Sequence, residues 1–234
     1  VCKMARQHVT VALSGDAGDE LFGGYERYFV GRSLWNKISW MPPAMKKMTA
    51  AALTALPPRV LNGLGTKVLP KRLRHIPLGD KLHKLAEVVA APGIETLYLN
   101  LMSHWKKPQD IVINGKDPVT AITNTASWPR VSDFTHRMMH LDMETYLPGD
   151  ILTKVDRAAM GVSLEGRIPL LDHDLIEFAW RVPFSMKVRD GKGKWLMRET
   201  LYRHVPKALI DRPKRGFGIP LDVWLRGPLR AWAE

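Results

Sequence analysis

The stretch that decides the fold is Val9-Thr10-Val11-Ala12-Leu13-Ser14-Gly15-Asp16-Ala17-Gly18-Asp19-Glu20-Leu21-Phe22-Gly23-Gly24-Tyr25. It opens with a short apolar run rich in β-branched side chains, which predicts a buried strand at residues 9–13 rather than a helix. Ser14 and Gly15 end this strand and begin a loop of small residues. Asp19 and Glu20 then open a helix that we expect to reach Tyr28, because acidic residues in a first turn favour the helix dipole.

The loop between this strand and this helix suits a phosphate site. Small residues at a helix N-terminus present backbone N–H groups to an anion. The same segment carries the carboxylates of Asp16, Asp19 and Glu20, which would repel a phosphate unless a cation intervenes. Mg²⁺ is the natural cation, since it prefers oxygen ligands and bridges nucleotide phosphates. The alternative is an ordinary capped loop in which Asp16 accepts backbone hydrogen bonds.

The rest of the chain is predicted to be mostly helical. Periodicity indicates helices through residues 36–128, cut into short pieces by prolines. Outside this region we expect a helix end at 1–6, helices at 131–148, 151–161 with Asp150 as N-cap, 172–180, 195–204 and near Trp224, and a glycine-rich turn at 215–218. The sequence pattern therefore predicts a mostly helical chain with a short strand near its start.

The composition and charge of the chain limit the possible classes of protein but do not select one. The 234 residues carry a net charge of +12, and residues 44–85 hold nine Lys or Arg against the single Asp80. Nucleic-acid binding, a membrane-surface helix and a solvated basic face are the three interpretations of this segment. Aromatic residues are nearly absent there, so stacking on single-stranded bases is not expected. The single cysteine, Cys2, indicates a reducing compartment, and no apolar run reaches the ~20 residues of a membrane span.

Four ordered blocks resemble the asparagine synthetase family. They are residues 14–25 (SGDAGDELFGGY), 146–160 (YLPGDILTKVDRAAM), 165–173 (EGRIPLLDH) and the closing lysine loop and tail at 191–195 (GKGKW) and 212–218 (RPKRGFG). The resemblance covers about residues 1–30 and 130–234 and is much weaker between them.

The resemblance implies an α/β fold, a nucleotide α-hydrolase-like domain of the PP-loop ATP pyrophosphatase type. Here it would be truncated and helix-dominated, with one or two strands and about ten helices. Residues 1–234 would be the C-terminal part of the synthetase domain. The chain begins with Val1 and has no Ser-Gly-Gly-x-Asp-Ser run, so we expect a fragment without the first phosphate loop and without the N-terminal glutaminase domain. Cys2 follows Val1 and is not expected to replace that domain's nucleophile. Alone, the fragment is expected neither to hydrolyse glutamine nor to make asparagine.

The activity implied by the resemblance is a cytoplasmic, glutamine-dependent ligase reaction of asparagine biosynthesis. The aspartate side chain attacks the α-phosphate of ATP, giving a β-aspartyl adenylate and pyrophosphate, and ammonia derived from glutamine then displaces AMP. ATP and Mg²⁺ are the implied cofactors. The site residues implied are Asp16 and Lys194 for catalysis, Ser14, Gly15, Gly18 and Arg157 for ATP and pyrophosphate, and Asp19 for the metal.

The sequence leaves several alternatives open. The acceptor could be another carboxylate, in antibiotic or polysaccharide synthesis, and a non-catalytic basic module for nucleic acid or membrane is the alternative of another class. Neither nucleic acid nor membrane is the expected partner, and a homodimer is left open. Arg157, one turn after Lys154, could meet phosphate or face solvent. The remaining expectations are structural: an ion pair between Glu165 and Arg167, a helix start at His173 and Asp174, and core positions for Trp180, Trp195 and Trp224.

Overall fold

The computed structural model describes residues 1–68, 70, 77–103, 110–115, 118–131, 133–211 and 220–234. It divides the chain into two compact units, Val1–Leu196 and Met197–Glu234, which are described separately below. The predicted glycine-rich turn at 215–218 lies outside the described residues.

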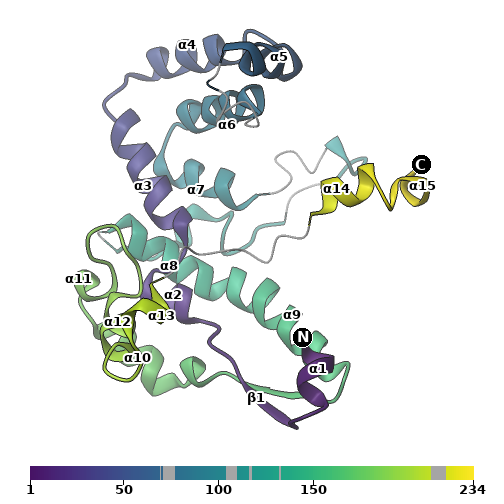
Figure 1. The fold of residues 1–234 in the computed structure, drawn as a ribbon. Helices are drawn as coiled ribbons and strands as arrows, with labels where there is room; N and C mark the ends of the chain where they lie inside the picture. The colour runs from purple at the N-terminus through teal and green to yellow at the C-terminus, as the bar shows by residue number, and fades with distance from the viewer. Residues whose placement is uncertain (69, 71–76, 104–109, 116–117, 132, 212–219) are drawn as a thin grey trace. The chain divides into compact units, whose positions relative to one another are not determined.

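The first unit contains a two-stranded parallel sheet. β1 (Val11–Leu13) pairs with β2 (Glu165–Arg167), with Val11 opposite Glu165 and Leu13 opposite Arg167. Figure 1 shows β1 leading directly into the loop before α2. The predicted strand was in the right place but too long, and the expectation that it is buried was wrong, since Leu13 is 76% exposed. With one neighbouring strand, the side chains of β1 have few elements to pack against.

The helix predicted to continue to Tyr28 is interrupted. α2 (Gly18–Phe22) ends at Gly23, whose φ of 67° is the left-handed conformation that stops a helix. α3 (Glu26–Ile38) starts after an extended Tyr25. The Gly23-Gly24 pair therefore separates two helices where a single one was expected.

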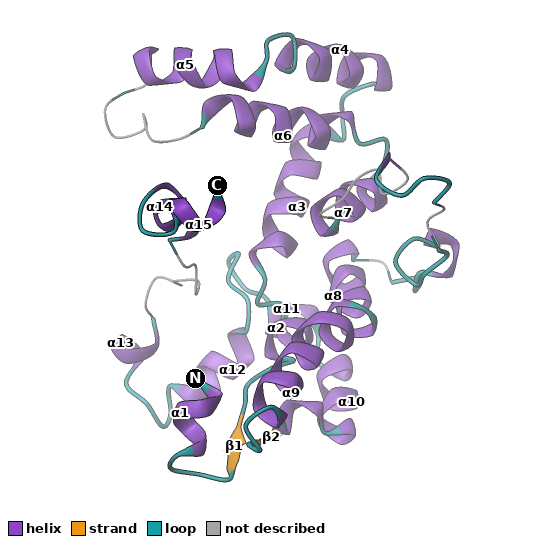
Figure 2. Ribbon diagram, turned by 90° about the vertical axis from the view of Figure 1, so that its right-hand side faces the viewer, coloured by secondary structure: helices purple, strands orange, loops and turns teal. Residues whose placement is uncertain are grey.

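Prolines punctuate the helical middle as predicted. α4 (Pro43–Leu53) and α5 (Pro58–Val68) have proline as their first residue, and α6 (Leu78–Ala90) follows Pro77. α4 and α5 both pack on α6, and Figure 2 shows the three helices stacked beyond the end of α3. Proline is tolerated at these starts because the first N–H groups of a helix have no intrahelical partner.

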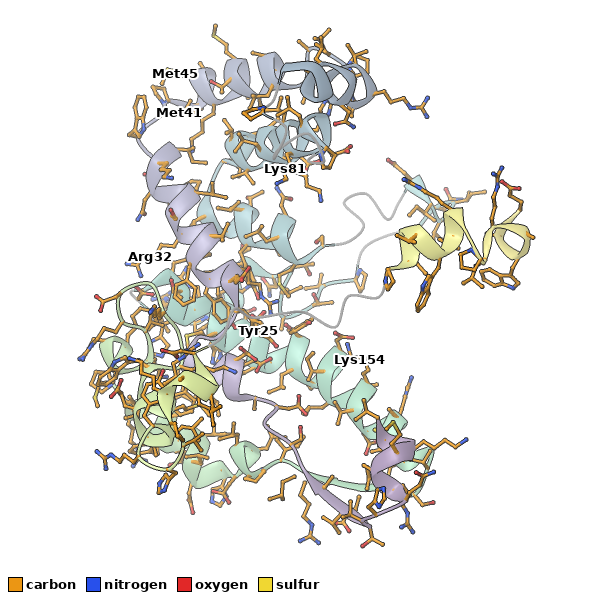
Figure 3. All side chains as sticks on the ribbon, in the orientation of Figure 1. Tyr25, Arg32, Met41, Met45, Lys81 and Lys154 are labelled. Atoms are coloured by element: carbon orange, nitrogen blue, oxygen red, sulfur yellow. The ribbon has the colours of Figure 1, made fainter. Side chains whose placement is uncertain are left out.

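Among the basic residues of segment 44–85 whose side chains the structure describes, most face solvent. Lys47, Lys81 and Lys84 are exposed, and Lys81 extends from α6 in Figure 3. Lys46 is the exception, because it is buried with its Nζ 4.3 Å from the Trp35 ring centroid. This cation–π contact replaces part of the hydration that Lys46 loses.

The core of the first unit lies between α3, α7 (Ile94–Met102) and α8 (Phe134–Glu144). Its buried residues are Tyr28, Tyr98, Trp128, Met138, Met139 and Leu141. Tyr98 meets Trp128 edge to face with ring centroids 5.8 Å apart, a geometry that aromatic pairs prefer. Between α7 and Trp128, the structure describes the short helix η3 (Thr125–Ser127).

The chain after α8 differs from the prediction. A π-helix, η4 (Leu147–Leu152), runs without interruption into α9 (Thr153–Met160). Asp150 is therefore inside a helix and not an N-cap, and its carboxylate accepts from Lys154 instead. The helix predicted at 131–148 ends earlier than expected, since α8 stops at Glu144. Pro148 lies in the first turn of η4, where a proline costs no intrahelical hydrogen bond.

The remaining helices follow the predicted order. They are η5 (Pro169–Leu171), α10 (His173–Arg181), α11 (Phe184–Lys187) and α12 (Trp195–Leu201), after α1 (Cys2–Arg6) at the start. Asp172 caps α10 by accepting from the backbone N–H groups of Asp174 and Leu175, so the predicted helix start is confirmed. The labels reach α15 among the described residues, more helices than the ten expected.

The second unit contains short helices: α13 (Lys207–Ile210), α14 (Leu221–Arg226) and α15 (Arg230–Ala233). Asp211 accepts from Arg198 and from the Tyr202 hydroxyl, which joins α12 to the end of α13. A helix near Trp224 was predicted, but Trp224 is 38% exposed and does not occupy a core position in its unit. Across the described parts of both units, every helix is too short or too polar to cross a membrane.

Candidate functional site

The loop between β1 and α2 is closed by its own hydrogen bonds. The Ser14 hydroxyl donates to the Asp16 carboxylate at 2.5 Å, and the Ser14 N–H continues the sheet by donating to the Arg167 carbonyl. Ala17 has a φ of 68°, a left-handed conformation that is costly for a residue with a Cβ. Backbone strain of this kind clusters at active and ligand-binding sites, where the surrounding structure holds the loop in one conformation.

The three carboxylates of this segment do not lie together. Glu20 is 1% exposed and points into the core, where its Oε1 accepts from the Tyr25 hydroxyl at 2.7 Å. Burial raises the pKa of Glu20 above its usual value, although the hydrogen bond from Tyr25 acts the other way. The expected group of three repelling carboxylates was therefore wrong, and only Asp16 and Asp19 remain beside the loop.

A second loop, residues 189–194, is docked on the end of α2. Its backbone is pinned by reciprocal hydrogen bonds between Arg189 and Lys192. The Lys194 N–H donates to the Phe22 carbonyl at 2.7 Å. Lys194 has a φ of 59°. The residue that supplies the positively charged side chain therefore has a strained backbone. From here on, the lysine loop means residues 189–194, which include Gly191-Lys192-Gly193-Lys194 of the family block.

The docking brings two predicted site residues together. Lys194 Nζ lies 3.0 Å from Asp19 Oδ1, and the two side chains are 29% and 26% exposed. The two residues lie 175 positions apart in the sequence (194 minus 19). Because this ion pair is only partly exposed, water screens its attraction less than that of a fully exposed pair. It also avoids most of the desolvation cost of a buried pair.

Two glycines make this close approach sterically possible. A Cβ on Gly193 would lie 1.8 Å from the Gly23 carbonyl oxygen, so no larger residue fits between the lysine loop and α2. A Cβ on Gly24 would lie 2.0 Å from Asp19 Oδ1 and 2.3 Å from Lys194 Cε. The glycines of two distant motifs therefore serve the same contact.

The donor set around Asp19 fits a magnesium ion bound together with phosphate. Asp16 on the loop and Asp19 in the first turn of α2 supply hard oxygen ligands, and both are only partly buried. Mg²⁺ commonly uses one or two protein carboxylates and fills its other positions with water and phosphate oxygens. Lys194 beside Asp19 is a further positive charge for the same anion.

The other charged residues predicted near the site behave differently. Arg157 is exposed on α9, and the described residues give no hydrogen bond or ion pair between it and the β1–α2 loop. Lys154, one turn earlier and labelled in Figure 3, pairs with Asp150 at 3.2 Å. The predicted ion pair between Glu165 and Arg167 is confirmed at 2.7 Å.

Asp172, His173 and Asp174 gather three metal-type ligands at the start of α10, but all three are exposed. The Asp172 carboxylate already caps the helix. The cluster is therefore explained by helix capping. Trp180 and Trp195 are partly buried, in keeping with their predicted packing role.

Sequence reasoning missed two buried polar clusters. Asp142 is 0% exposed and accepts from Arg27, Tyr28 and Tyr98. Lys187 is also 0% exposed, with its Nζ 3.4 Å from His136 Nε2 and 4.5 Å from the Trp180 ring centroid. No local pattern marks either residue as buried, because these hydrogen-bond partners lie at least 44 positions away in the chain.

Open depressions occur away from the β1–α2 loop. One of about 460 Å³ lies between α3 and the lysine loop, bordered by Arg32, Lys37 and Gly191. Another of about 460 Å³ lies beside residues 6–11. Neither contains Asp16 or Asp19, so the geometry of the two loops carries the assignment.

A strand, a small-residue loop and an acidic helix start, closed by a lysine loop, define an α/β protein whose acidic and basic motifs meet at one place. The family follows from comparison with known proteins. A family model described as asparagine synthase matches residues 1–234. The chain belongs to the asparagine synthase family.

Curated relatives agree with this family. "Asparagine synthetase [glutamine-hydrolyzing] 1" of Bacillus subtilis is 32% identical over 235 residues, covering 100% of this chain and 34% of the relative. A Mycobacterium tuberculosis protein provisionally named as the same kind of synthetase is 33% identical over 234 residues, covering 100% of this chain and 33% of that protein. "Amidase chry2" of Gibberella zeae is 26% identical over 240 residues, covering 95% and 34%.

The chain spans about one third of the length of these relatives. No solved structure matches it. This chain has a helix-dominated α/β fold with a small parallel sheet.

Proposed function

We propose that this chain forms part of the ATP-using site of a glutamine-dependent amide ligase. In the proposed reaction, a carboxylate attacks the α-phosphate of ATP to give an acyl adenylate and pyrophosphate. Ammonia then attacks the acyl carbon, and AMP leaves. The observation that carries the proposal is the 3.0 Å contact between Lys194 Nζ and Asp19 Oδ1, because it joins the family's acidic loop to its lysine loop.

The residues divide the chemistry between two loops. Asp19 would hold Mg²⁺, which supplies positive charge to phosphate oxygens when bound. Lys194 would stabilise the negative charge that grows on the α-phosphate and on the leaving pyrophosphate. Asp16, which accepts from Ser14, would take a proton from attacking ammonia.

Pyrophosphate would be held by the small-residue loop. Ser14, Gly15 and Gly18 lie at its two ends, between β1 and the N-terminus of α2. The Ser14 and Gly18 N–H groups already have backbone acceptors, and the Ser14 hydroxyl already donates to Asp16. The remaining loop amides are therefore the proposed donors, and the Ser14 hydroxyl would join them by turning from Asp16 to the pyrophosphate. Arg157 stays a proposed phosphate contact only if the anion reaches α9.

Aspartate is the proposed acceptor, with ammonia from glutamine as the nitrogen source. The support is the printed names of the Bacillus subtilis and Mycobacterium tuberculosis relatives. The names of the fungal relatives describe amidases, so a different carboxylate is the alternative acceptor. We further propose that the fold is of the PP-loop ATP pyrophosphatase type and that residues 1–234 are the C-terminal part of its synthetase domain. In the longer protein, a glutaminase domain and a first phosphate loop would complete the site.

The test uses the full-length protein that contains this chain, with the substitution Asp19→Asn. We expect ATP-dependent formation of AMP and pyrophosphate to fall by about 10²-fold or more, because one oxygen ligand of the cation loses its charge. The matched control is Asp174→Asn, which alters an exposed carboxylate at the start of α10. A panel of carboxylates, with aspartate first, identifies the acceptor.

The two alternatives give different results. If Asp19→Asn lowers thermal stability but leaves pyrophosphate formation unchanged, Asp19 is only part of a helix start. If the parent protein forms no AMP with any carboxylate but binds DNA with a steep salt dependence, the basic-module hypothesis replaces the ligase.

A further inference from the structure

Arg27 and Asp142 form the most extensively bonded polar pair in the described part of the first unit. Arg27 donates through Nη2 at 2.7 Å and through Nε at 3.1 Å to the same carboxylate oxygen of Asp142. Tyr28 donates to that oxygen at 2.6 Å, and Tyr98 donates to the other oxygen at 2.7 Å. The Asp142 carboxylate thus joins α3, α7 and α8 at one point.

The guanidinium of Arg27 also lies over two tyrosine rings. Its Cζ is 3.9 Å from the ring centroid of Tyr25 and 4.6 Å from that of Tyr146. The two rings meet edge to face with centroids 5.8 Å apart. We call Tyr25, Arg27 and Tyr146 the tyrosine clamp; Tyr25 is labelled in Figure 3 near the start of α3.

The tyrosine clamp contacts α2, which contains Asp19, and adjoins η4, which continues into α9. Tyr25 follows α2, and its hydroxyl donates to the buried Glu20 carboxylate at 2.7 Å. Glu20 is the neighbour of Asp19 in α2. Tyr146 immediately precedes η4, the π-helix that continues into α9. One guanidinium therefore contacts the ring that anchors α2 and the ring that begins η4.

α2 needs an external anchor of this kind. It has only five residues, and it is bounded by left-handed residues at Ala17 and Gly23. A helix this short does not hold its own direction, since its few internal hydrogen bonds barely offset the cost of nucleation. The direction of the Asp19 side chain therefore depends on what Glu20 and its neighbours contact.

The pair is better explained by orientation than by stability. A buried ion pair contributes little net stability, because desolvation offsets most of its attraction. Burial and the Asp142 carboxylate raise the pKa of Tyr28 and Tyr98, so both hydroxyls stay protonated and donate. Asp142 thus has a fixed set of donors that holds one orientation of Arg27, and Arg27 in turn fixes the two rings.

We propose that Arg27 and Asp142 are positioning residues, which hold α2 and η4 in the arrangement that presents Asp19 to a divalent cation. This inference rests on the proposed function for its catalytic meaning. The clamp itself can be tested without any reaction.

The first measurement is hydrogen exchange by mass spectrometry on the full-length protein without Mg²⁺. In Asp142→Asn we expect backbone amides of α2 and η4 to exchange about ten-fold faster or more, because local opening becomes easier when an anchor is lost. Glu95→Gln is the matched control. It removes the Glu95–Arg137 pair, an ion pair of 3.3 Å between the same helices α7 and α8, but away from the clamp.

The second measurement is the Mg²⁺ concentration that gives half-maximal AMP formation at saturating ATP. Loss of a group that orients a metal ligand commonly costs about 10–100-fold in metal affinity or activity. We expect a shift of that size in Asp142→Asn and less than about two-fold in Glu95→Gln. Arg27→Lys keeps the charge but lacks the planar fork, so it should fall between the parent and Arg27→Met.

The outcomes separate this inference from the proposed function. Unchanged exchange in α2 and η4 of Asp142→Asn, or an equal change in Glu95→Gln, overturns the clamp. If Asp142→Asn does not fold, Arg27→Lys carries the same test with the same two outcomes. If the parent forms no AMP with any carboxylate, the proposed function fails while the exchange measurement still decides whether the clamp holds α2.

Discussion

Lys194→Ala separates a catalytic lysine from a lysine that only docks a loop. In the structure, Lys194 contributes two different contacts. Its backbone N–H donates to the Phe22 carbonyl at 2.7 Å, and its Nζ lies 3.0 Å from Asp19. Alanine keeps the first contact and the left-handed backbone, and removes only the second. The lysine loop should therefore stay docked in the variant.

The two contacts predict effects of very different size. Loss of a partly exposed ion pair costs on the order of 1 kcal/mol, which lowers the melting temperature by roughly 2–4 °C in a domain of this size. Loss of a cation that stabilises transition-state charge costs about 10²–10³ in rate, because the charge on the α-phosphate grows as the carboxylate attacks. A catalytic Lys194 thus gives a large change in rate and a small change in stability.

The assay is rapid-quench measurement of AMP and pyrophosphate in the full-length protein, with glutamine hydrolysis measured in parallel. Lys192→Ala is the control in the same loop. The Lys192 side chain is exposed and its backbone makes the bridge to Arg189, so truncation should change the rate less than about two-fold. Glutaminase turnover should be largely unchanged in both variants, because that chemistry is expected in another domain.

The reasoning about Lys194 is refuted by equal, small effects of the two alanine variants. It is also refuted if AMP formation falls only in proportion to a large loss of folded protein. In either case the 3.0 Å contact with Asp19 is structural, and the charge on the phosphate must be stabilised by another group.

Two further predictions test the packing around the site. Gly193→Ala places a Cβ 1.8 Å from the Gly23 oxygen, so it should displace the lysine loop and slow AMP formation at least as much as Lys194→Ala, whereas Gly166→Ala, whose Cβ meets nothing within 4 Å, should not. Burial lowers the pKa of Lys187 from 10.5 to about 8, so between these values the unfolded chain binds more protons and the parent should gain up to about 3 kcal/mol of stability as pH rises. Lys187→Met should be at least as stable as the parent at pH 7 and lose this rise in urea unfolding measured from pH 7 to 10.5; an unchanged rise would show that Lys187 is not its source.

The local elements of the site could be predicted from the sequence because their causes are local. An apolar run, a small-residue loop and an acidic first turn predicted β1 and the start of α2 within a few residues. Proline at helix starts correctly divided the middle of the chain. These signals depend on backbone sterics within one turn.

The errors arose where distant residues decide the structure. The helix through Tyr28 was predicted from its acidic first turn, but the docked lysine loop requires the break at Gly23 and Gly24. Asp150 looked like an N-cap because it follows Pro148 and Gly149, and no local pattern announces a π-helix. Asp142 is polar in the sequence and buried in the fold because its three donors come from positions at least 44 residues away.

The contact between Lys194 and Asp19 also bears on how the proposed site could change partners. Both charges are about one quarter exposed, so water lowers the cost of separating them. On the proposed function, a cation takes the Asp19 carboxylate while a phosphate takes the Lys194 ammonium, and each side chain exchanges one opposite charge for another. The docked backbone need not move for this exchange, since the Lys194 N–H bond to Phe22 and the fit of Gly193 on Gly23 do not involve the side chain. The fixed backbone and the exchangeable ion pair therefore do separate work: the first aligns the two loops before substrate arrives, and the second leaves their charges available for it.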